Sequence, residues 1–199
     1  MESDRLQAVN RMILTQRVRL AVNQYEIHEE APGGGQGELI AFAQQKRLTL
    51  RERVTFWNDT ERSSVFGGFV HRDVVDLGGT YDVTGPDGET VVGTFSKDFK
   101  KSLTRSTWHL DQPGLTTMTG SERNAKVAAA RRVARFIPVV DDLPIWAYHF
   151  DFRLEGALAL SVSRKRTLRD RYLVEIHEPR LDRRLVVALA VALDAMQGR

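Results

Sequence analysis

The sequence predicts a mainly β fold: a closed antiparallel barrel of about twelve strands around a hydrophobic C-terminal helix, with one inserted amphipathic helix. Three observations favour it. The run Leu185–Leu193 has no polar side chain, so a helix formed there must be covered on every side. Short β-type runs closed by turn sequences fill most of the chain from Gln16 to Glu178. A spacing of apolar and leucine residues recurs along these runs.

Length and composition indicate one packed domain over residues 1–199. The chain has 199 residues, of which 42% are hydrophobic, and only six prolines. It has no cysteine, which excludes disulfides and thiolate metal sites. Charges within Met1–Arg11 do not fit a signal peptide, so we expect a cytoplasmic protein. Arginine outnumbers lysine 23 to 6, which suggests a GC-rich bacterial genome.

The predicted strands follow an N-terminal extension over about residues 1–12. Roughly a dozen short runs exceed what an open twisted sheet usually holds, and closure into a barrel removes the exposed edges. Turn sequences between the runs support an antiparallel arrangement. They are Ala31–Gly35, Asn58–Asp59, Gly85–Gly88, Asp111–Gly114 and Glu155–Gly156.

A repeat relates several of these strands. In each copy an apolar residue precedes a leucine by eight positions: Phe42 with Leu50, Phe69 with Leu77, Phe95 with Leu103, and Leu160 with Leu168. The first three copies are offset by 27 and 26 residues and the fourth by 65. We therefore expect an insertion between copies three and four.

Copies one and four show period-two alternation, which is typical of a strand with one buried face. The residues on the apolar faces are Leu50, Val54, Phe56, Leu168, Tyr172, Val174 and Ile176. Glu52 and Asp170 fall on the same faces. Either each of them pairs with a neighbouring arginine, or the regular strand begins just after it.

The insertion is predicted to contain a helix within about residues 120–138. Ser121 is the expected N-cap, and Glu122 lies in the first turn, where negative charge suits the helix dipole. Apolar residues follow at helical spacing until Pro138 ends the run. The opposite face is basic.

The terminal helix is predicted over about residues 183–197, with Asp182 as N-cap and Gly198 as the stop. Its apolar part, Leu185–Met196, is about 18 Å long at the helical rise. A bilayer core is ~30 Å thick, so this helix cannot span a membrane. We expect it to fill the barrel instead.

The main functional signal is an uneven distribution of charge. Residues 97–135 contain nine basic and three acidic residues, whereas the whole chain has a net charge of +3. The polar segments Gln44–Arg47, Lys97–Lys101 and Ser163–Arg166 are expected to be tight connections at one rim. Each base near an anionic lipid surface adds about 1 kcal/mol of binding energy. The alternative is a solvated charged face. Candidate anionic-lipid contacts are Lys97, Lys100, Lys101, Arg105, Arg131, Arg132, Arg135, Arg164, Lys165 and Arg166.

No motif in the chain demands a reaction, and we predict no catalytic residue, cofactor site or metal site. His71–Asp73 resembles a kinase catalytic-loop tripeptide but lacks the other kinase motifs. The five histidines never occur at the short spacings of metal ligands on one element. Aromatic residues are not interleaved with the basic segment, which makes nucleic acid an unfavoured partner. An enzyme or small-ligand carrier would need a site assembled from separate strands, such as His109, His149 and Asp151.

Five sequence motifs resemble those of the LURP-one-related family, which belongs to the superfamily of tubby C-terminal domains and phospholipid scramblases. The motifs are Gly78–Val83, Leu103–Trp108, Tyr148–Phe152, Leu168–Tyr172 and Leu181–Leu185. The resemblance implies a twelve-stranded barrel closed around a hydrophobic C-terminal helix. Scramblase-like members carry an acidic calcium segment before that helix, whereas His177–Asp182 has only two acids. Calcium-triggered lipid transport is therefore not expected.

These observations together predict a non-enzymatic binding or scaffold protein, cytoplasmic and peripheral to the membrane, that contacts anionic lipid through a basic surface. A protein-protein interaction module is the other alternative, favoured if the inserted helix exposes an apolar patch.

Overall fold

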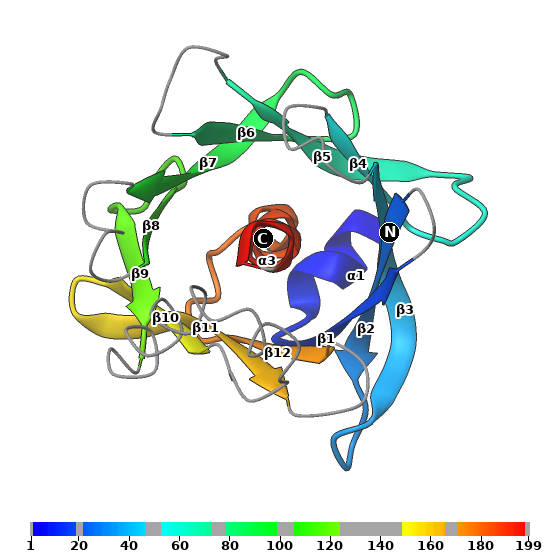
Figure 1. The fold of residues 1–199 in the computed structure, drawn as a ribbon, viewed down its shortest axis with the longest axis horizontal. Helices are drawn as coiled ribbons and strands as arrows, with labels where there is room; N and C mark the ends of the chain where they lie inside the picture. The colour runs from blue at the N-terminus through cyan, green and yellow to red at the C-terminus, as the bar shows by residue number, and fades with distance from the viewer. Residues whose placement is uncertain are drawn as a thin grey trace, which may run out of the picture.

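The computed structural model of the chain is a closed barrel of twelve antiparallel strands around one helix (Figure 1). It describes residues 2–18, 22–46, 53–72, 79–98, 106–123, 149–165 and 171–197. Each strand pairs with its neighbours in sequence, and β1 pairs with β12 to close the barrel. The strands are β1 Arg11–Val18, β2 Val22–Glu30, β3 Gln36–Lys46, β4 Val54–Trp57, β5 Val65–His71, β6 Thr80–Thr84, β7 Val91–Asp98, β8 Thr107–Asp111, β9 Met118–Glu122, β10 His149–Leu154, β11 Ala157–Lys165 and β12 Arg171–Ile176.

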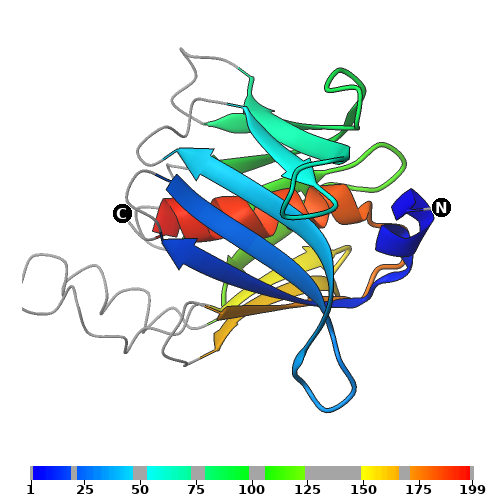
Figure 2. The ribbon, with the colours of Figure 1, turned by 90° about the vertical axis from the view of Figure 1, so that its right-hand side faces the viewer.

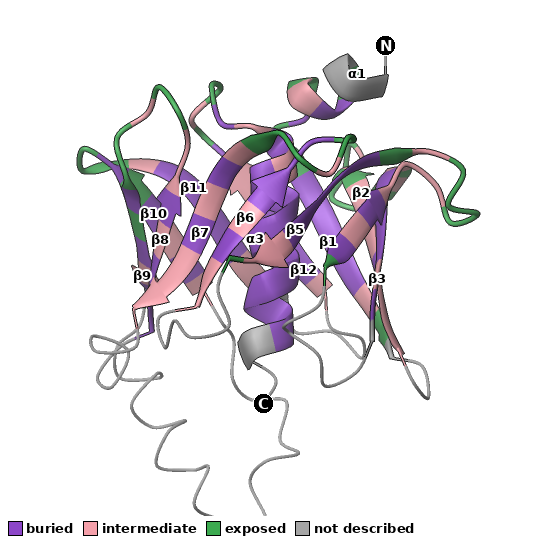
Figure 3. Ribbon diagram, turned by 90° about the horizontal axis from the view of Figure 1, so that it is seen from above, coloured by how far each residue is buried: buried purple, intermediate pink, exposed green. Residues whose placement is uncertain are grey.

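The terminal helix α3, Arg183–Gln197, runs lengthwise through the barrel (Figure 2). Leu189 and Val191 are completely buried. Figure 3 shows α3 coloured as buried along most of its length, as a helix enclosed by strands requires. A short helix α1, Glu2–Ala8, lies at the end of the barrel where α3 begins. The predicted fold class and central helix are therefore confirmed.

The barrel has two different ends. At the turn end, where α3 begins, the five predicted turn sequences join strands β2 to β3, β4 to β5, β6 to β7, β8 to β9 and β10 to β11. A backbone bond from Gly88 N to Gly85 O, 3.0 Å long, closes one of them. Glu155 and Gly156 have φ angles of 49° and 89°, a left-handed pair that suits a two-residue hairpin turn. At the other end, which we call the C-terminal end, α3 finishes.

The repeat marks odd-numbered strands, although its first copy differs from the others. Phe69, Phe95 and Leu160 belong to the core inside the barrel. Phe42 instead faces outward and packs on Trp57, with ring centroids 6.2 Å apart. The four repeat leucines, together with Glu52 and Asp170, lie outside the described residues.

Several predicted boundaries were wrong. The first strand begins at Arg11, before the predicted Gln16. Ser121 and Glu122 do not start a helix but end strand β9, because both residues pair with β10. Gly120 and Glu122 are on the inner face of this strand. The remainder of the predicted insertion helix lies outside the described residues. The segments predicted as rim connections begin within strands, since β3, β7 and β11 extend to positions 46, 98 and 165.

Candidate functional site: the C-terminal end of the barrel

Polar and charged side chains line the inner wall of the barrel at its C-terminal end. Residues directly opposite each other across an antiparallel pair share a face, so the strand registers show which side chains point inward. Lys97 pairs with the buried Trp108, and Arg164 pairs with the buried Tyr172. The inward-facing polar and aromatic residues at this end include Asn23, Tyr25, Gln45, His71, Tyr81, Lys97, Trp108, Glu122, Arg164 and Tyr172.

One contiguous part of this wall runs from β5 to β8. His71 meets the ring of Tyr81 edge-on, with centroids 4.9 Å apart, and Tyr81 stacks on Phe95 at 5.0 Å. The Phe95 and Trp108 ring centroids are 6.3 Å apart. The Lys97 ammonium lies 5.7 Å from the centroid of the Trp108 ring, within the range of a cation–π contact. A cation is thus held beside an aromatic wall at the end of the barrel.

A second part of the wall surrounds the last turns of α3. Asp194 is buried, and the Tyr172 hydroxyl donates a 2.6 Å hydrogen bond to its carboxylate. Burial raises the pKa of Tyr25, and the nearby Asp194 charge raises it further. Tyr25 therefore stays neutral over the physiological range. A carboxylate near a helix C-terminus opposes the helix dipole, so this position is costly for folding.

Buried side-chain nitrogens without a hydrogen-bond partner are concentrated at the same end. Within the described part of the chain they are His71 Nδ1, Trp108 Nε1, His149 Nδ1 and Arg171 Nε. Each residue lies in the first two or the last position of its strand, at the C-terminal end. A buried donor without an acceptor costs about 1–3 kcal/mol, and such groups gather at functional positions.

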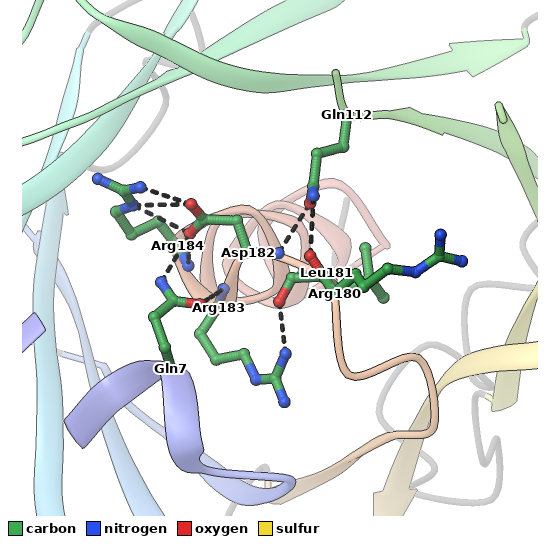
Figure 4. Close-up of polar contacts among 7 residues, drawn as sticks. All are labelled: Gln7, Gln112, Arg180, Leu181, Asp182, Arg183 and Arg184. Carbon is green, nitrogen blue, oxygen red and sulfur yellow. Dashed lines mark hydrogen bonds and ion pairs between the residues drawn. The ribbon is translucent and has the colours of Figure 1, made fainter. Parts of the chain in front are cut away.

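The turn end, in contrast, is closed by a dense polar network (Figure 4). Asp182 caps α3 by accepting a 2.9 Å bond from the backbone nitrogen of Arg184, which confirms the predicted N-cap. Its carboxylate also binds the Arg184 guanidinium and the Gln7 amide. Gln112 accepts a 2.7 Å bond from the Asp182 backbone nitrogen and donates to the Arg180 carbonyl. The beginning of α3 is thus tied to both α1 and the β8–β9 turn.

The two ends also differ in charge, because the strand ends assign every connecting sequence to one of them. The sequences that connect strand ends at the C-terminal end, residues 19–21, 47–53, 72–79, 99–106, 123–148 and 166–170, contain fifteen bases and six acids. Those at the turn end, residues 1–10, 31–35, 58–64, 85–90, 112–117, 155–156 and 177–182, carry three bases and nine acids. The net charges are +9 and −6, although the whole chain carries only +3.

The candidate lipid contacts divide into two groups. Lys97 and Arg164 are described, and both lie at the C-terminal end with their side chains on the inner face. Lys165 is opposite Arg171 in the β11–β12 pair. The others, Lys100, Lys101, Arg105, Arg131, Arg132, Arg135 and Arg166, lie outside the described residues. Their contact with lipid stays a prediction.

The histidines and aspartate of the alternative enzyme site are on the outer face, where His149 and Asp151 lie near each other beside Arg123 and His109 contacts other residues. Asp151 receives bonds of 2.9 and 2.7 Å from Arg123, whose charge holds the pKa of the carboxyl below its usual range. Burial and the Arg123 charge lower the pKa of His149. His109 lies on β8, with Nε2 3.7 Å from Asp98 and Nδ1 3.4 Å from the Thr119 hydroxyl. His149, Asp151 and Arg123 thus form one polar group, and His109 with Asp98 and Thr119 forms another.

The described residues contain no group of three or more histidine, aspartate or glutamate residues placed to hold a metal ion. No helix among them is both long and apolar enough to cross a membrane.

Sequence reasoning missed most of the polar wall, although a signal for it existed. His71 and Lys97 each follow a core phenylalanine by two positions, Phe69 and Phe95. Period two therefore placed both polar residues on the inner face. The prediction of surface connections follows from the polar run that these basic residues begin, and it overlooks the alternation.

The fold defines a class of proteins: antiparallel barrels closed around their own C-terminal helix, with an inner wall that is polar at one end. A family model described as LURP-one-related matches residues 39–194. The chain therefore belongs to the LURP-one-related family. No curated protein and no solved structure gave a match.

Proposed function

We propose that this protein is a non-enzymatic binding module that attaches peripherally to anionic membrane surfaces through the C-terminal end of its barrel. The observation that carries the proposal is the difference in charge between the two ends, +9 against −6. An anionic surface attracts one end and repels the other, so it selects an end-on orientation. The turn end and α1 then face away from the membrane.

The magnitude of this attraction is sufficient for reversible binding. Each base near an anionic surface contributes about 1 kcal/mol, so four or five engaged bases give about 4–5 kcal/mol. The attraction is screened over a Debye length of about 8 Å at physiological ionic strength. Binding must therefore weaken as salt is added.

Co-sedimentation with vesicles tests the proposal. We expect binding to mixed phosphatidylglycerol and phosphatidylcholine vesicles, and none to phosphatidylcholine alone. Two double variants are compared, K100E/K101E in a sequence that connects strands at the C-terminal end and R62E/R180E at the turn end. Each replaces two bases by two acids, so the change in charge is the same. Arg62 and Arg180 are both exposed, so the two double variants are matched controls.

The first double variant should lose most of its vesicle binding, and the second should bind at least as well as the natural protein. Equal loss in both would contradict an end-on mode, and binding that is insensitive to salt would contradict an electrostatic one.

A further inference from the structure

The inner wall between β5 and β8 combines three features that are found together nowhere else in the described structure. It has a cation, Lys97, whose ammonium lies beside the Trp108 ring. It has an indole N–H on a fully buried side chain with no acceptor among the described groups, Trp108 Nε1. It has a second buried nitrogen without a partner, His71 Nδ1, which is three ring contacts away from Trp108 through Phe95 and Tyr81.

We propose that Lys97 and Trp108 form a subsite for the phosphate group of an anionic lipid headgroup, with His71 farther along the same wall. This inference rests on the proposed function and adds to it a specific recognition group inside the end of the barrel. Neutral N–H donors and an ammonium satisfy phosphate oxygens, and hydrogen bonds to a charged acceptor are stronger than those between neutral groups. A buried indole N–H gains most from such a partner, since it otherwise lacks one.

Glu122 is the acidic residue that restricts where a phosphate group can bind on this wall. It is buried on the inner face of β9, two positions beyond Gly120, which pairs with Trp108. A phosphate close to this carboxylate is repelled. The subsite therefore lies on the β5–β7 side of Trp108, where His71, Tyr81 and Lys97 are the neighbours. Tyr81 supplies the aromatic surface between them.

The positions of His71 and Lys97 in their strands favour a ligand that enters from the C-terminal end of the barrel. His71 is the last residue of β5, and Lys97 is next to last in β7. Both are partly exposed, whereas Trp108 behind them is not. A headgroup at the membrane surface therefore meets Lys97 and His71 first and the indole last. Non-specific electrostatic attraction to a membrane surface would not require a buried N–H donor such as the Trp108 indole.

The experiment compares W108F with W57F. Each variant replaces one indole by a phenyl ring, but Trp57 faces outward on β4, away from the subsite. Binding of monomeric dihexanoyl phosphatidic acid, dihexanoyl phosphatidylcholine and inorganic phosphate is measured by calorimetry, after circular dichroism has confirmed that each variant is folded. Sedimentation with phosphatidylglycerol vesicles is measured in parallel.

We expect W108F to bind phosphatidic acid about tenfold more weakly than the natural protein, as the loss of one donor to a charged acceptor predicts, and W57F to be unchanged. K97Q should weaken binding further, and E122Q should strengthen it. Tighter binding of phosphatidic acid than of inorganic phosphate assigns the subsite to a lipid headgroup, and equal binding assigns it to phosphate from any source.

The proposal is overturned if W108F binds phosphatidic acid as the natural protein does, or if the natural protein does not distinguish phosphatidic acid from phosphatidylcholine. Either result leaves the vesicle sedimentation of the natural protein intact, so the broader function survives it. The natural protein could instead fail to bind vesicles and still bind phosphatidic acid in a way that depends on Trp108. That result would contradict the proposed membrane attachment and support the subsite.

Discussion

At the scale of single residues, Arg183 shows how the turn end is held together. Its side chain is buried, yet it bonds to no carboxylate. The guanidinium donates instead to the carbonyls of Val9, Pro179 and Leu181 and to the side chain of Asn10. Burial lowers the pKa of Arg183, and the charge of Asp182 opposes that effect. Arg183 therefore joins the N-terminal segment to the beginning of α3.

Arg183→Met should destabilise the protein by about 3 kcal/mol or more, because four acceptors lose their donor at once and two of those hydrogen bonds, to Val9 and Leu181, are buried. Chemical unfolding followed by tryptophan fluorescence measures the change. The control is Arg180→Met, since the Arg180 side chain is exposed and, within the described structure, bonds to the neighbouring Glu178 alone. That substitution should change the free energy of unfolding by less than about 0.5 kcal/mol. Similar losses in the two variants would show that the buried network contributes no special stability.

At the scale of elements, small residues let α3 approach the barrel wall. A Cβ atom at Gly93 of β7 would lie 2.7 Å from the Asp111 carbonyl oxygen and 2.7 Å from Leu185 Cδ2. The helix packs closest to β5, β6 and β7, where Gly67 is a second inner glycine. The Arg184 side chain passes over it, with Cδ 3.5 Å from the Cβ position. Glycine is thus required by close packing at these positions, not by backbone conformation.

Gly93→Ala should destabilise the protein by about 2 kcal/mol, because the new methyl group meets both backbone and the helix. Gly35→Ala is the matched control, since its Cβ would meet nothing within 4 Å in the β2–β3 turn. Thermal unfolding of the two variants should therefore separate clearly. An unchanged melting temperature for Gly93→Ala would mean that α3 shifts in the barrel at little cost.

The elements that the sequence predicted well are those with a strong local signal. Two such signals can be recognised without knowledge of the tertiary structure. They are the turn sequences rich in glycine, proline and aspartate, and the apolar run that follows Asp182. The end of β9 was wrong because Ser121 and Glu122 also satisfy the rules for a helix start. Only the pairing of Glu122 with Phe150 decides between the two interpretations, and that contact is between residues far apart in sequence.

The candidate site shows the same limit. A basic segment is visible in the sequence, but its inner placement is not, because the face of Lys97 depends on strand register. Trp108 was seen only as part of a family motif. Its buried N–H becomes apparent once the neighbouring strands are in place.

At the scale of the whole molecule, the two ends perform different physical tasks. The turn end holds saturated polar contacts around Asp182 and Arg183, which fix α3 in the barrel. At the C-terminal end, the strand ends are connected by sequences with a net positive charge, and the described part of the chain has its buried nitrogens without partners there. The contacts that stabilise α3 and the end to which we assign binding thus lie apart along the barrel axis, so substitutions at one end should leave the property of the other end largely intact.

The acid stability of the molecule should depend on Asp182. Burial alone would raise the pKa of this carboxyl, but hydrogen bonds from the Arg184 side chain and backbone and from Gln7 hold it below the usual value. A lowered pKa in the folded state stabilises the protein above the unfolded pKa of about 4, and this contribution is lost as the pH falls through the lower folded value. The free energy of unfolding should therefore fall as the pH is lowered from about 5 toward 2.

Asp182→Asn should be less stable than the natural protein at pH 7, and its stability should depend less on pH below about 5, because the group that titrates has been removed. Arg184→Met should have the same effect on the slope, since it removes the charge that favours the ionised carboxyl. Urea unfolding at a series of pH values gives the slopes directly. Because Asp182 is at the turn end, both variants should keep their binding to anionic vesicles at pH 7. A loss of vesicle binding by a folded variant would show that the two ends are coupled through α3.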